Sequence, residues 1–158
     1  MSGFVHLRVH SEYSLVDSVV RVDALIDRVR SRGMSAVALT DLGNVSALVK
    51  FYRAAVGAGV KPIIGADLWV AAAPDDSDPA RLTLLCTDLR GYRSLSLLLT
   101  NSYARNPGRP RVLKEWLSPQ ALDGLIALSG AQRGELGRTS HRCGQSALVL
   151  LADRRTHE

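Results

Sequence analysis

A regular alternation of apolar and polar residues opens the chain at residues 4–17, which read FVHLRVHSEYSLVD. Apolar side chains occupy every second position from Val5 to Val9, and a period of two is the spacing of a β-strand with one buried face. We therefore expect a strand over Phe4–His10. The serine-rich residues 11–18 that follow predict a polar loop at the carboxyl end of that strand.

Strand and helix patterns alternate along the rest of the chain. Short apolar runs predict strands, whereas apolar residues three and four apart predict helices. This alternation favours an α/β fold with largely parallel strands. The expected helices are Val22–Arg32, Val45–Val56, Gly91–Tyr103 and Ser146–Asp153, and the expected further strands are Ala36–Thr40, Lys61–Val70 with a candidate break at Gly65, Leu82–Thr87 and Gly124–Ser129.

Length and composition bound the class of protein. The 158 residues suit one domain, and 46% apolar residues are enough to bury a core. No apolar run approaches the ~18 residues that span a membrane, and the first residues lack the pattern of a secretory signal. The sequence therefore predicts a cytoplasmic protein without membrane contact. Cys86 and Cys143 form no CxxC pair, which argues against a disulfide scaffold and a cysteine zinc site.

Positive charge is concentrated towards the end of the chain. The formal net charge is +5, and residues 101–158 hold 9 basic and 5 acidic side chains. Such an excess permits a nucleic-acid partner or another acidic partner but selects neither.

Four ionisable residues fall just past the expected strands, where parallel α/β folds place their ligand sites. His10 and Asp17 follow the first strand, Asp41 follows the second, and Asp67 lies at the far end of the third. Imidazole and carboxylate are the ligands that zinc and manganese take. Two interpretations follow: a metal-assisted phosphoesterase, or polar loop residues that cap helices and bind the backbone.

Several motifs, in order, resemble the polymerase and histidinol phosphatase (PHP) domain at the N-terminus of bacterial replicative DNA polymerase III alpha subunits. The resemblance implies a seven-stranded βα barrel with a metal centre at one mouth, so that this chain would form an incomplete PHP-type (β/α) barrel. It assigns residues 1–138 to the PHP domain, and residues 139–158 remain an unmatched basic tail. Besides residues 4–17, the motifs are Ala38–Asn44, Val49–Tyr52, Gly59–Asp67, Gly91–Leu95 and Gly124–Gly130.

The metal centre of the family transfers to this sequence only incompletely. Family histidines fall on Arg8, Leu42 and Arg81, and neither leucine nor an always-protonated arginine binds a cation. The family's glutamate falls on the shorter Asp67. The resemblance therefore implies a degenerate metal site.

Three positions keep a metal-ligand type: His10, Asp17 and Asp67. Zinc needs about four ligands, so we expect no cofactor, with weak residual zinc or manganese as the remaining option. Arg8 and Arg81 would put guanidinium charge where the metal charge lay. We expect them to pair with Asp17, Asp67 or the nearby acid Asp41 through charge-assisted hydrogen bonds.

A structural role is what the resemblance implies for function. Polymerisation needs a palm domain with magnesium-binding carboxylates, and 158 residues hold no such domain, so we expect no DNA synthesis by the chain itself. It would be the PHP portion of an alpha subunit, a scaffold that supports the remaining polymerase domains, docks the proofreading exonuclease subunit and meets DNA only indirectly. The alternatives are an active metal-dependent phosphoesterase or 3′–5′ exonuclease, and a truncated product without function.

Overall fold

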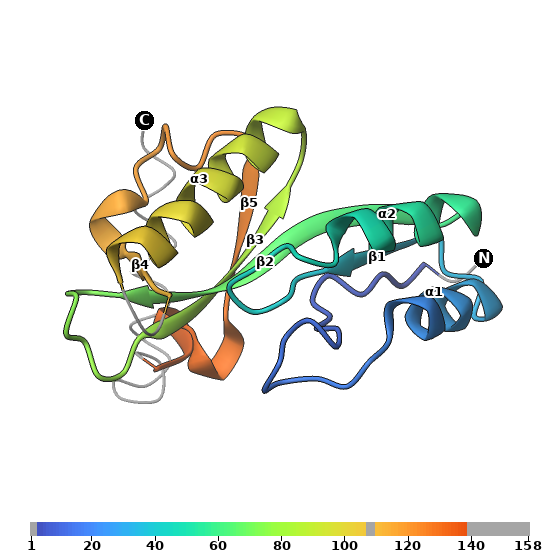
Figure 1. The fold of residues 1–158 in the computed structure, drawn as a ribbon, viewed down its shortest axis with the longest axis horizontal. Helices are drawn as coiled ribbons and strands as arrows, with labels where there is room; N and C mark the ends of the chain where they lie inside the picture. The colour runs from blue at the N-terminus through green and yellow to red at the C-terminus, as the bar shows by residue number, and fades with distance from the viewer. Residues whose placement is uncertain (1–2, 107–109, 139–158) are drawn as a thin grey trace.

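Helices flank a five-stranded sheet in the computed structural model, which describes residues 3–106 and 110–138 (Figure 1). The α/β class predicted from the sequence is confirmed. The helices are α1 (Val22–Ser31), α2 (Leu48–Gly57) and α3 (Leu89–Arg105), the 3₁₀ turns are η1 (Lys114–Trp116) and η2 (Ala131–Arg133), and the strands are β1 (Ala36–Leu39), β2 (Lys61–Ala71), β3 (Ala80–Cys86), β4 (Val112–Leu113) and β5 (Leu125–Ser129).

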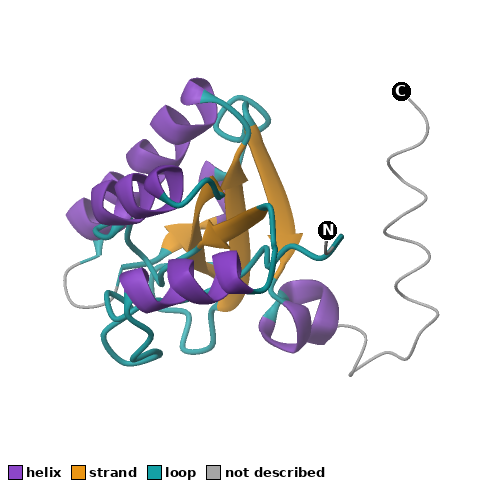
Figure 2. Cartoon of the chain, turned by 90° about the vertical axis from the view of Figure 1, so that its right-hand side faces the viewer, coloured by secondary structure: helices purple, strands orange, loops and turns teal. Residues whose placement is uncertain are grey.

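The three helices α1, α2 and α3 lie close to their expected positions because each buries one apolar stripe. In Figure 2 the helices border the strands on the left and below. The fourth expected helix, Ser146–Asp153, lies outside the described residues, as does the tail 139–158. Within the described residues, no helix has the length and apolar character of a membrane span.

The sheet is mixed, and this corrects the expectation of largely parallel strands. β1 and β4 run parallel to β2, whereas β3 runs antiparallel to both of its neighbours, β2 and β5. A parallel crossover needs a connection of about a dozen residues or more. The connection 72–79 between β2 and β3 is shorter than that, so the two strands form a hairpin. β2 also continues through Gly65, so the candidate break at this residue does not occur.

Residues 4–10 lie beside β1 but do not form the expected regular strand. His6 makes an isolated parallel bridge with Val37, and the His6 and Val9 carbonyls accept backbone hydrogen bonds from Ala38 and Thr40, both at 2.8 Å. The backbone N–H of Val9, however, donates to the Thr40 hydroxyl at 3.1 Å. This side chain takes the place of a ladder bond and interrupts the strand.

Two apolar cores share the long strand β2. One core lies between β1 and the helices α1 and α2, centred on Phe51 and Val37. The other lies under α3, where Leu95 and Leu98 pack against Leu68 of β2 and its neighbours in β3. Figure 1 shows β2 running from one half of the molecule to the other.

Close backbone contact fixes the start of α3 against the loop before β5. The Asp88 carboxylate caps the helix by accepting hydrogen bonds from the backbone N–H groups of Arg90 and Gly91. A Cβ atom on Gly91 would collide with the Gly124 carbonyl group. Only glycine therefore fits where the start of α3 meets the loop before β5. The packing of the core under α3 depends on this close contact.

Candidate functional site

Asp67 of β2 is the centre of a buried cluster of charged side chains. Its side chain is 0% exposed. Its Oδ2 atom lies 2.7 Å from Arg8 Nε, 2.6 Å from Arg8 Nη2, 2.9 Å from His10 Nε2 and 3.1 Å from Arg81 Nη1. The other oxygen, Oδ1, accepts a hydrogen bond from the Thr83 hydroxyl. One carboxylate therefore meets three basic side chains and one hydroxyl.

The hairpin of β2 and β3 brings several of these side chains to one face of the sheet. Asp67 lies opposite Thr83, and Trp69 lies opposite Arg81, and directly opposed residues of an antiparallel pair share a face. The Arg81 guanidinium carbon sits 4.1 Å from the centre of the Trp69 ring. Leu42, which follows β1, forms a parallel bridge with Asp67 but contributes only an apolar side chain at this position.

Asp17 joins the cluster from the loop that precedes α1. Its Oδ2 atom accepts a hydrogen bond from Arg81 Nη2 at 3.0 Å and lies 3.1 Å from His10 Nδ1. Arg81 thus bridges two carboxylates, one on β2 and one in the loop. Its Nε is buried without a hydrogen-bond partner among the described residues.

Hydrogen bonds control the ionisation of the two acids. Burial alone raises the pKa of Asp67, but hydrogen bonds from His10, Arg8 and Thr83 outweigh burial and hold this pKa well below its usual value. The hydrogen bond from Arg81 lowers the pKa of Asp17 against the opposing effect of desolvation. Both groups are therefore carboxylates at neutral pH, and they neutralise the two guanidinium groups.

Asp41 lies outside this cluster, contrary to the possibility that an arginine pairs with it. Its buried carboxylate accepts hydrogen bonds from the Ser11 backbone N–H at 2.6 Å, the Ser11 hydroxyl at 2.7 Å and the Ser14 hydroxyl at 2.8 Å. Asp41 therefore holds the loop after residue 10 in place. Sequence reasoning missed both serines and Thr83, although Thr83 stands two residues after Arg81, as a strand face requires.

The donor set around Asp67 does not fit a bound cation. Arg8, His10 and Arg81 all direct nitrogen atoms at the same carboxylate oxygen, Oδ2. A metal ion at that oxygen would lie against two permanent positive charges. No group of three or more His, Cys, Asp or Glu side chains suited to a metal occurs in residues 3–106 and 110–138.

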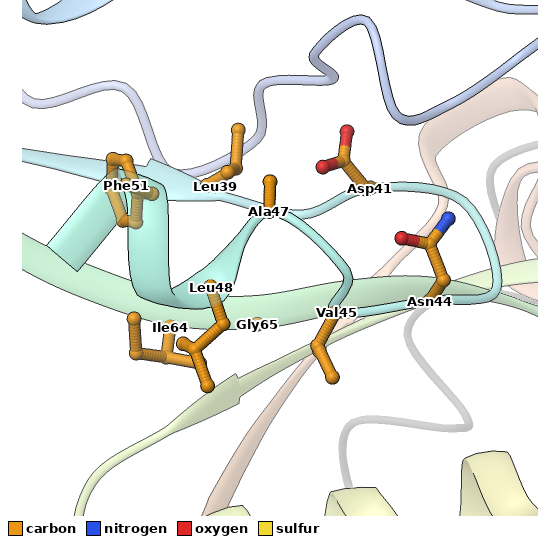
Figure 3. A pocket seen from close by; sticks show the side chains of 9 residues that line it. All are labelled: Leu39, Asp41, Asn44, Val45, Ala47, Leu48, Phe51, Ile64 and Gly65. Atoms are coloured by element: carbon orange, nitrogen blue, oxygen red, sulfur yellow. The ribbon is translucent and has the colours of Figure 1, made fainter.

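Two cavities lie away from the charged cluster. A pocket of about 10 Å³ between α2 and β2 has room for one water molecule at most (Figure 3). A larger apolar groove, of about 660 Å³, separates α2 from the ends of β3 and β5. Residues lining this groove include Val49, Tyr52, Ile63, Leu85 and Ile126.

Comparison with known proteins gives a consistent picture. The PHP domain family model matches residues 6–154. The chain is 46% identical over 137 residues to DNA polymerase III subunit alpha of Pseudomonas aeruginosa, which covers 85% of this chain and 12% of that protein. For the same subunit of Escherichia coli K12 the identity is 43% over 148 residues, which covers 92% of this chain and 13% of that protein. The chain thus spans only about an eighth of these relatives.

Among solved structures, an amidohydrolase from Chromobacterium violaceum superposes with a TM-score of 0.50 at 22% identity, over 63% of this chain and 33% of that one. This likeness concerns the fold alone.

Proposed function

This chain belongs to the PHP domain family, and we propose on that basis that it serves DNA replication as the N-terminal PHP portion of a DNA polymerase III alpha subunit. In this role it is a structural scaffold that works without a metal ion. The similarity to alpha subunits over most of the chain supports the assignment to replication. The charged cluster supports the metal-free scaffold.

The observation that carries the scaffold role is the saturation of Asp67 by basic side chains. Arg8 and Arg81 put positive charge on the same oxygen, and charge-assisted hydrogen bonds of this kind are short and strong. Through Arg81 and Asp17 the cluster also joins the loop before α1 to the hairpin of β2 and β3. Guanidinium groups then connect the segments that a metal ion would otherwise connect.

The proposed partners are the remaining polymerase domains of the alpha subunit and the proofreading exonuclease subunit. The chain spans about an eighth of its relatives, so most of such a subunit lies outside it. DNA would be contacted by those other domains, and the whole would act in the cytoplasm. Coelution of the chain with the Pseudomonas aeruginosa proofreading subunit on size exclusion tests the second partner, and separate elution argues against it.

A metal-dependent phosphoesterase or 3′–5′ exonuclease is the alternative function. It would need Asp67, Asp17 and His10 to release their present partners and bind a cation instead. The Arg81 side chain, which is 2% exposed and bonded to both acids, stands against such a rearrangement.

Thermal melting with and without excess zinc or manganese distinguishes the two functions. A ligand at a hundred times its Kd stabilises the folded state by about 2.7 kcal/mol, which is a rise of roughly 5–10 °C for a chain of this size. We expect no such rise for the wild-type chain. The triple variant Arg8→His/Leu42→His/Arg81→His, which restores the three histidines of the family and keeps Asp67, is the positive control. A metal-induced rise in the wild type, with release of phosphate from a phosphoester, would contradict the scaffold proposal.

A further inference from the structure

We draw no further inference here: the strongest candidate, the apolar groove between α2 and the ends of β3 and β5, carries none, because nothing in the part of the chain that the structure describes shows whether the rest of a PHP-type barrel, another protein or a second copy of the chain covers it.

Discussion

Arg81 and Arg8 bind the same carboxylate oxygen but from different environments. The side chain of Arg81 is 2% exposed, whereas that of Arg8 is 43% exposed. Removing one partner of a buried ion pair leaves an uncompensated charge and costs about 3–5 kcal/mol, whereas an exposed pair contributes about 1 kcal/mol or less. We therefore expect Arg81→Ala to lower the free energy of unfolding by about 3–5 kcal/mol, and Arg8→Ala to lower it by less, because the Arg8 side chain is 43% exposed although its partner Asp67 is buried.

Urea denaturation of the two variants measures this difference, with the exposed Arg21→Ala as a control that should behave as wild type. Equal losses for Arg8→Ala and Arg81→Ala would show that burial does not set the strength of the cluster.

Asp67 also makes stability depend on pH. Because its pKa is lower in the folded chain than the unfolded value of about 3.9, the unfolded chain binds more protons in acid. The stabilisation is therefore complete above about pH 5 and is lost as the pH falls through about 4 towards the folded pKa. Melting temperatures measured over this range should fall steeply for the wild type and less steeply for Asp67→Asn. Parallel slopes would mean that other carboxylates carry the acid sensitivity.

The sequence indicates which residues meet at the site but not how they pair. Strand ends on one side of an α/β sheet converge, which is why the positions of His10, Asp17 and Asp67 are enough to group them. Which side chain bonds to which carboxylate depends on how far each side chain extends in the folded chain. Position alone therefore groups Asp41 with the arginines, although the serines of the adjoining loop enclose it.

At the level of elements, the start of α3 depends on the absence of a side chain at Gly91. A Cβ there would meet the Gly124 carbonyl oxygen, so Gly91→Ala must separate the helix from the loop before β5. We expect a loss of about 1–3 kcal/mol in the free energy of unfolding, the usual cost of overpacking. Gly57→Ala, at the end of α2 where a Cβ meets nothing within 4 Å, is the matched control and should be neutral or slightly stabilising. Chemical denaturation compares them, and a harmless Gly91→Ala would refute the close contact.

Periodicity locates the helices because a buried stripe repeats within one segment. It cannot reveal strand direction, which depends on the connection between segments, so it does not predict the hairpin of β2 and β3. Periodicity also cannot show that β2 continues through Gly65, because this depends on how closely β2 approaches its neighbour β3. A Cβ there would lie 2.5 Å from the Leu84 carbonyl oxygen, so this glycine permits a close approach to β3 where the sequence indicates a break.

Across the whole molecule, the apolar groove leaves one side of the sheet accessible. Ile126 lies in the groove on β5, the last strand in the sheet of the described residues, and is half exposed. An end strand with apolar side chains invites pairing between molecules. We expect the isolated chain to self-associate as its concentration rises, and Ile126→Lys to reduce this without lowering the melting temperature. Sedimentation velocity measures the effect, and a wild-type chain that stays monomeric at high concentration would contradict it.

The length of β2 has a consequence for how the molecule opens. Ile64 packs on the core beneath α1 and α2, and Ala66 and Leu68 belong to the core beneath α3. Neither half can lose its order without disturbing a strand that the other half needs, so the two cores form one cooperative unit. The backbone amides in the middle of β2 should then be among the slowest in the chain to exchange with deuterated water, opening only when the whole domain unfolds.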